Sequence, residues 1–428
     1  MLNIKKISLG ISFFLSSVAY GVFQPFYPLQ ARDNHVSLWI IGLIFSIVPM
    51  TGVPSIWLNN KIQHKVGRKF IFLFSSLIQG ISMIILPFAA DCNRDEFIAL
   101  SFLSRFFYGV GVGFLWGSGL AIATSEFKDQ AQEVIGEISA HSGIGSVIGP
   151  LLGTVLYLIG GVSVAYIVSG AVFIIYIPLA YFTLGNLHSS IEEHEKLELF
   201  RLWKRPQIFL AADIQLFVYA SMYFMSASIS VHLDGYGVSQ ENIGFLFTAF
   251  YFCNGVGSIV FSKITRVDKR IIMLVGLSGI GFAMSMMGPS IIFPDDVQIV
   301  IISIPLLGIM CALAFVPSYS YMAEVAVSKY GYTDNLPLSD TLSSISNFSM
   351  SIGEILGAVV SGILVDFITY QHSAGIILAL VLILVPIFAY SCDIASLVKK
   401  NINKNTDEYL LKTMEVDNTA IINEETSR

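Results

Sequence analysis

Long apolar runs recur along this chain, and they constrain its fold more than any other feature. A helix needs about 20 apolar residues to cross the hydrocarbon core of a bilayer, and only helices or closed barrels satisfy every backbone polar group there. Of the 428 residues, 54% are hydrophobic and 13% are charged, which is too apolar for a soluble domain of this length. The runs lie at 7–31, 38–59, 70–90, 97–124, 134–158, 162–185, 208–232, 241–263, 270–293, 298–326, 341–367 and 373–394.

These runs predict an all-α membrane protein with twelve transmembrane helices in two sets of six. Residues 186–205 between the sets are polar and rich in charge, so we expect a linker between an N-terminal bundle (1–185) and a C-terminal bundle (206–394). Residues 395–428 form a polar tail that cannot build a core, and we expect this tail to be disordered.

Basic residues collect on one side of the predicted membrane. Lys and Arg accumulate in cytoplasmic loops, and placing both termini in the cytoplasm leaves only Arg32 and Arg94 in the opposite loops. We therefore expect both termini to be cytoplasmic. The opposite face either attracts cations or consists of ordinary solvated loop ends; its acids are Asp33, Asp91, Asp95, Glu96, Asp234, Glu241, Asp295 and Asp296.

A glycine-rich pattern occurs once in each set of helices. Small residues one turn apart let two helix backbones approach closely inside a bilayer, and a proline bends its helix. Packing alone would account for either copy, but two copies 208 positions apart indicate a duplicated transporter. The first copy contains Gly145, Gly149, Pro150 and Gly153, and the second contains Gly353, Gly357 and Gly362.

Few ionisable residues lie inside the predicted spans, where such residues mark pathways or coupling sites. Glu354 is the deepest acid, and Arg105 is the one basic residue within a span. Glu133, Glu137 and His141 recur every four residues and so share one helix face near a cytoplasmic end. We expect Glu354 to carry a coupled proton, because a carboxyl far from water favours its neutral form. Arg105, Glu137 and His141 are the further candidates.

No motif of a soluble enzyme competes with this interpretation. The sequence lacks the phosphate-binding loop G-x-x-x-x-G-K-[ST], and it also lacks H-E-x-x-H, C-x-x-C and G-x-S-x-G. We therefore expect no enzyme activity and no cofactor or metal, and any transport must draw on an existing gradient. The expected partners are the lipid bilayer, protons and a substrate, with no nucleic acid, and the expected state is a monomer.

Several of these residues resemble motifs of the major facilitator superfamily, and the resemblance covers about residues 5–395. The stretch from Gly145 to Gly153 looks like the fifth-helix antiporter motif of that superfamily. The stretch from Arg105 to Gly111 resembles its fourth-helix motif, in which the arginine is implicated in proton coupling. The resemblance implies two pseudo-symmetric six-helix bundles around a central cavity.

A short basic segment resembles the gate loop that joins the second and third helices in this superfamily. Gly67, Arg68 and Lys69 match the end of the family motif. Asn60 stands where the family has glycine, and His64 stands where it has aspartate. These two departures bear on the charge contacts that the family loop makes between gate helices.

Within the superfamily, the chain is most similar to the vesicular amine transporter family, especially its polyamine branch. The similar stretches are Pro25 to Pro28, Ile41 to Phe45 and Pro317 to Tyr319, together with the second glycine-rich copy. The resemblance implies a proton-coupled antiporter that moves a small organic cation out of the cytosol across a vesicle, organelle or plasma membrane. A broad-specificity drug exporter, a facilitative uniporter and a non-transporting receptor or scaffold remain open as alternatives.

Overall fold

The computed structural model describes residues 2–90, 92–127, 130–185, 187, 199–264, 267–288, 293–333 and 335–391. Within these ranges the secondary structure is helical, and no strand occurs, as predicted. Most of the expected linker and the whole expected tail lie outside the described residues. The helices are α1 (Leu2–Asp33), α2 (Leu38–Val66), α3 (Arg68–Ala89), α4 (Arg94–Glu126), α5 (Ala131–Leu184), α6 (Leu199–Trp203), α7 (Pro206–Gly235), α8 (Gln240–Ser262), α9 (Lys269–Met287), α10 (Val297–Ser328), α11 (Leu336–Phe367) and α12 (Tyr370–Ser391).

Helix α5 contains two of the predicted spans. Its backbone leaves the helical conformation at Gly160 (φ −160°, ψ 25°) and Gly161 (φ 76°, ψ −175°), and the positive φ at Gly161 is one that glycine adopts readily. The segments on either side of this kink are each long enough to cross a bilayer. The eleven membrane-length helices in the described ranges therefore contain twelve spans. The remaining helix, α6, has five residues and lies within the expected linker.

Several helices begin or end away from the predicted limits. Helix α11 begins at Leu336 rather than 341, because the side chain of Asn335 accepts a hydrogen bond from the backbone N–H of Leu338 and caps the helix. Helix α9 ends at Met287 rather than 293, because Gly288 leaves the helical conformation (φ −116°, ψ 76°). Hydropathy alone does not predict where a capping residue starts a helix or where a glycine ends one.

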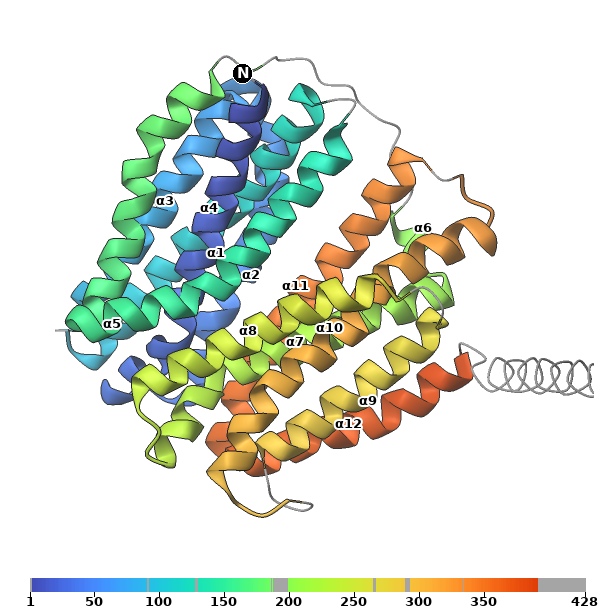
Figure 1. Ribbon diagram of the computed structural model, residues 1–428. Helices are drawn as coiled ribbons and strands as arrows, with labels where there is room; N and C mark the ends of the chain where they lie inside the picture. The colour runs from blue at the N-terminus through green and yellow to red at the C-terminus, as the bar shows by residue number, and fades with distance from the viewer. Residues whose placement is uncertain are drawn as a thin grey trace, which may run out of the picture.

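Helices α1 to α5 pack together as one bundle, and α7 to α12 pack as another (Figure 1). We call the side that carries the start of α1 the N-terminal side, and the opposite side, which carries Asp33 and Gly235, the far side. The bundles diverge toward the N-terminal side in Figure 1. They contact each other toward the far side, where the backbone of Gly42 on α2 approaches that of Ala358 on α11.

The two glycine-rich copies occupy corresponding places in the two bundles. A Cβ atom at Gly145 of α5 would lie 2.5 Å from the carbonyl oxygen of Phe14, and one at Gly149 would lie 2.7 Å from that of Val18, both on α1. The next member, Gly153, packs against Val22 of the same helix. The first copy thus lets α5 approach the α1 backbone closely.

The second copy does the same in the C-terminal bundle. A Cβ atom at Gly353 or Gly357 of α11 would clash with carbonyl oxygens of α7. The third glycine, Gly362, instead faces Leu38 and Trp39 of α2, so it brings the two bundles together on the far side. The repeat therefore places α1 with α5 and α7 with α11 in equivalent pairs.

Candidate functional site

Glu354 lies on α11 between the two bundles and is partly exposed there. Its carboxyl interacts with the hydroxyl of Tyr223 on α7. It also interacts electrostatically with Tyr20 of α1, Tyr219 of α7 and Tyr251 of α8. A carboxylate among aromatic rings suits an organic ammonium ion, because the carboxylate neutralises the charge while the ring faces attract the cation.

A buried amide holds this group of tyrosines in place. Gln24 of α1 is fully buried; its Oε1 accepts a hydrogen bond from the hydroxyl of Tyr251 (2.7 Å), and its Nε2 donates to Ser226 Oγ on α7 (3.3 Å). The ring of Tyr20 lies 6.1 Å from that of Tyr223. These contacts join the N-terminal bundle to the C-terminal bundle directly beside the acid.

The sequence interpretation missed these tyrosines and Gln24. They come from three helices other than that of Glu354, so no local spacing connects them to the acid. One signal was present, because Tyr219 and Tyr223 stand four residues apart and hence on one face of their helix.

Arg105 is fully buried on α4, and its surroundings are aromatic. Its guanidinium carbon lies 4.0 Å from the ring centre of Phe23 and 4.8 Å from that of Tyr108. One terminal nitrogen, Nη2, contacts Met83 Sδ at 3.4 Å and Ser104 Oγ at 3.3 Å. Within the described residues, Nε and Nη1 have no hydrogen-bond partner, and no carboxylate pairs with the group. Cation–π contacts therefore stand in the place of a salt bridge.

A row of aromatic side chains connects Arg105 to Glu354. Tyr108 stacks on Tyr20, with ring centres 6.5 Å apart and ring planes inclined by 27°. Tyr20 in turn faces Tyr223, which interacts with the acid. Tyr20 interacts electrostatically with both Arg105 and Glu354, so it lies between the two candidate coupling groups.

Glu137 and His141 lie elsewhere, near the N-terminal end of α5. Lys6 of α1 pairs with Glu137 at 2.6 Å and with Glu133 at 2.9 Å. The Nδ1 atom of His141 lies 2.7 Å from the carbonyl oxygen of Glu137. These groups join α5 to α1, and the structure does not bring them to Glu354.

The segment between α2 and α3 that resembles the family gate loop turns at Gly67, where φ is 92°. Arg68 donates to a carbonyl near the end of α4 (3.4 Å), and Lys69 donates to the carbonyl just beyond α5 (2.8 Å). His64 is exposed near the end of α2. The two basic side chains thus bind the C-terminal ends of helices, where the helix dipole favours positive charge.

Comparison with known proteins identifies the family. The family model of the Major Facilitator Superfamily matches residues 9–234 and 214–407. The MFS-type transporter SLC18B1 of Homo sapiens is 25% identical over 373 residues, which cover 84% of this chain and 80% of that protein. Multidrug resistance protein MdtG of Yersinia enterocolitica is 26% identical over 207 residues, which cover 46% of this chain and 48% of that protein.

Solved structures share the fold. The nucleoside transporter NupG has a TM-score of 0.72 at 13% identity, covering 90% of this chain and 98% of that one. A bacterial homologue of the human lysosomal transporter Spinster, in an inward-facing and occupied conformation, has a TM-score of 0.69 at 14% identity. The match covers 91% of this chain and 96% of that one. These relatives are transporters rather than enzymes, and the superfamily predicted from the sequence is confirmed. The chain is a multi-pass membrane protein and belongs to the major facilitator superfamily.

Proposed function

We propose that this chain is a proton-coupled antiporter of small organic cations such as amines or polyamines. The observation that carries the proposal is the partly exposed Glu354 carboxyl, set among tyrosines between the two bundles. The similarity to the MFS-type transporter SLC18B1 supports a transporter, and the aromatic surroundings of the acid support a cationic substrate. One chain contributes both sides of the site, so a monomer suffices.

In this proposal the two bundles, 1–185 and 206–394, rock about the central site, joined by the linker 186–205. The N-terminal side faces the cytosol, as the distribution of basic residues indicates. The far side faces a vesicle or organelle lumen or the cell exterior. The divergence of the bundles toward the N-terminal side fits a cytosol-facing state (Figure 1).

Antiport follows if proton and cation compete for Glu354. An ionised carboxylate binds the organic cation on the cytosolic side, since the ion pair offsets the cost of charge at this depth. On an acidic far side the carboxyl takes up a proton and releases the cation. The protonated carboxyl then returns to the cytosolic side as the bundles rock, and the proton leaves there. Tyr20, which lies between Glu354 and Arg105, connects the protonation state of the acid to the buried guanidinium.

The experiment is uptake of labelled spermidine and of a labelled monoamine into proteoliposomes, with and without an imposed pH gradient. The wild-type chain is expected to concentrate at least one of them when the gradient is present. Glu354→Gln mimics the protonated acid permanently and is expected to abolish gradient-driven uptake. Glu137→Gln is the matched control, because Glu137 is half-exposed and pairs with Lys6 away from the site.

Three outcomes would contradict this proposal. Accumulation by Glu354→Gln with an unchanged pH dependence would place the coupled proton elsewhere. Uptake that ignores the pH gradient in the wild-type chain would indicate a uniporter, and absence of flux with substrate binding retained would indicate a receptor.

A drug-type exporter is the second candidate, because the chain also resembles the multidrug resistance protein MdtG over about half its length. Substrate profiling separates the two. An amine transporter requires a positive charge on its substrate, whereas a drug exporter also accepts neutral apolar compounds.

A further inference from the structure

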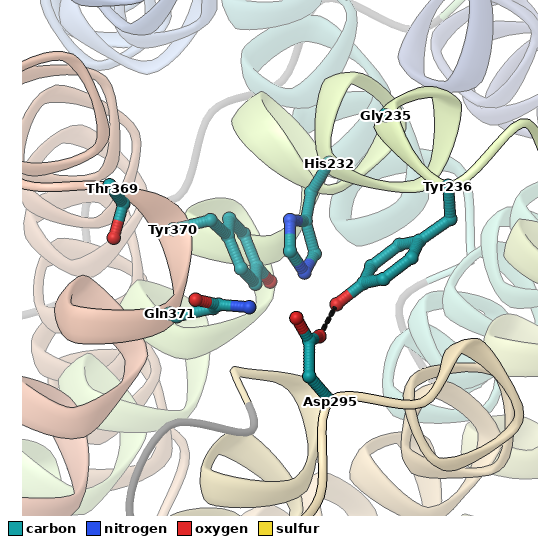
Figure 2. A pocket seen from close by; sticks show the side chains of 7 residues that line it. All are labelled: His232, Gly235, Tyr236, Asp295, Thr369, Tyr370 and Gln371. Atoms are coloured by element: carbon teal, nitrogen blue, oxygen red, sulfur yellow. Dashed lines mark hydrogen bonds between the residues drawn. The ribbon is translucent and has the colours of Figure 1, made fainter.

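A pocket on the far side lies away from Glu354, and the proposed transport cycle does not use it. The end of α7, the segment before α10 and the start of α12 line an open pocket of about 260 Å³ (Figure 2). All three elements belong to the C-terminal bundle. The lining residues are His232, Gly235, Tyr236, Asp295, Thr369, Tyr370 and Gln371.

Aromatic rings form one side of this far-side pocket. The ring of His232 stacks on that of Tyr370, with centres 4.2 Å apart and planes inclined by 16°. It meets the ring of Tyr236 edge to face, with centres 5.1 Å apart. The hydroxyl of Tyr236 donates a hydrogen bond to the carboxylate of Asp295 (Figure 2). Burial, and then the Asp295 carboxylate, raise the pKa of Tyr236, so this hydroxyl stays protonated and continues to donate.

Polar atoms in the far-side pocket lack partners within the described residues. Tyr370 is 4% exposed, yet its hydroxyl makes no hydrogen bond there, and neither does Nε2 of His232. Among the described residues, no lysine or arginine forms a salt bridge with the carboxylate of Asp295. Buried polar atoms in proteins usually have a hydrogen-bond partner, either a protein group or ordered water, so these atoms are free to accept hydrogen bonds from a group that enters the pocket.

The chemistry of the lining residues favours an organic cation over a metal ion. No group of three or more His, Cys, Asp and Glu side chains is placed to hold a metal within the ranges that the structure describes. An ammonium group carries hydrogen-bond donors and no acceptor, and it is attracted to aromatic faces. The carboxylate of Asp295, the hydroxyl oxygen of Tyr370 and the Nε2 of His232 are all able to accept hydrogen bonds.

We propose that the far-side pocket is a second binding site, specific for a small organic ammonium ion. Its volume lies below the roughly 300–1,000 Å³ of pockets that hold drug-sized ligands. A short amine, or one ammonium end of a longer polyamine, fits a pocket of this size.

The position of the far-side pocket gives it a role in substrate release, an inference that rests on the proposed function. Asp234 lies at the end of α7, between the pocket residues His232 and Tyr236. It pairs with Arg32 of α1, so this ion pair joins the two bundles. The pocket thus adjoins the contact between the bundles on the side where the proposed antiporter releases its cation. A cation that leaves the central site is held here before it reaches bulk solvent.

The test is equilibrium dialysis of labelled spermidine against the full chain in lipid nanodiscs. Glu354→Gln weakens the central site and is expected to leave one class of binding site, which belongs to the far-side pocket. Adding Asp295→Asn to that variant is expected to weaken the remaining binding at least about tenfold, because the charge-assisted hydrogen bond is lost. Tyr236→Phe, which keeps the ring and removes the donor to Asp295, is expected to change the affinity less.

Asp296→Asn in the same Glu354→Gln background is the matched control. It removes the same charge one residue away, and asparagine preserves the cap that Asp296 gives to Gln298 at the start of α10. Failure of spermidine to bind Glu354→Gln would overturn the second site, and so would equal binding by the Asp295→Asn and Asp296→Asn variants in this background. If the wild-type chain does not transport spermidine while the Glu354→Gln variant still binds it through Asp295, the proposed function is rejected and the second binding site is retained.

Discussion

Arg105 poses the sharpest problem at the scale of single residues, because a buried charge normally requires a partner. Its guanidinium lies over Phe23 and Tyr108, and no acid pairs with it within the described chain. Aromatic faces stabilise a desolvated cation by about 2 kcal/mol or more. Contacts with the two aromatic rings therefore offset part of the cost of burying the Arg105 guanidinium without an acid.

The variant Arg105→Gln is expected to fold and to lose gradient-driven uptake by at least about tenfold. Folding survives because removal of the guanidinium leaves no acid without its counter-ion. Proteoliposome uptake measures the loss, and thermal unfolding in detergent measures the stability. Arg94→Gln, at the exposed start of the same helix, is the control. Unchanged uptake by Arg105→Gln would make the arginine a packing residue.

At the scale of helices, the glycine repeat allows close helix packing, and its contribution to the free energy of unfolding can be measured. A Cβ at Gly145 would lie 2.5 Å from the carbonyl oxygen of Phe14, whereas a Cβ at Gly143 would meet nothing within 4 Å. Gly145→Ala is expected to destabilise the chain by about 1–3 kcal/mol, because backbone atoms cannot yield as a flexible side chain does. Gly143→Ala in the same helix is expected to be neutral or stabilising by up to about 1 kcal/mol. Unfolding in mixed detergent micelles compares the two, and equal effects would remove the close approach as an explanation.

The start of α9 offers a pH-dependent test outside the membrane. Asp268 caps this helix and binds the side chain of Arg270 at 3.0 Å. Burial alone would raise the pKa of Asp268, but the hydrogen bonds and charge of Arg270 outweigh it and lower the pKa below its ordinary value. A lowered pKa stabilises the fold at neutral pH, and this contribution is lost as the pH falls from about 5 through the lowered pKa.

Asp268→Ala is therefore expected to cost about 1 kcal/mol at neutral pH. The deficit relative to the wild-type chain should shrink on acidification, because protonation weakens the wild-type interaction as well. Thermal unfolding across this pH range measures both. A deficit that stays constant with pH would assign the whole effect to the capping hydrogen bond and none to the charge of Asp268.

At the scale of the whole molecule, the sequence predicts what is local and misses what depends on packing. The apolar runs place every transmembrane helix, because each run satisfies the length of the bilayer independently of its neighbours. The depth of Glu354 follows from the same runs. Its tyrosine neighbours do not, because the rotation of each helix about its axis is set by close contacts such as those of Gly353 and Gly357 with α7. The far-side pocket is missed for the same reason, since its residues come from three separate segments.

In the proposed transport cycle, contacts between the bundles on the far side favour the conformation that is closed on that side. Arg32 pairs with Asp234 across the bundles, and both side chains are partly exposed. The carboxylate of Asp366 on α11 accepts hydrogen bonds from the backbone N–H groups of Leu38 and Trp39, at 3.2 Å each. This second contact places a negative charge at the N-terminus of α2, where the helix dipole favours it.

Asp234→Asn is expected to shift the population toward a conformation open on the far side. An exposed ion pair contributes up to about 1 kcal/mol, so the ratio of the two conformations should change by no more than about fivefold. Distances between spin labels at His35 and Asn242, exposed positions on opposite bundles at this side, report the shift. The charge-reversed double variant Arg32→Asp/Asp234→Arg should restore the original distribution. Glu324→Gln, which removes the pair with Lys269 inside the C-terminal bundle, should leave the distribution unchanged. An equal response to this control would show that the ion pair between the bundles has no special part in closing the far side.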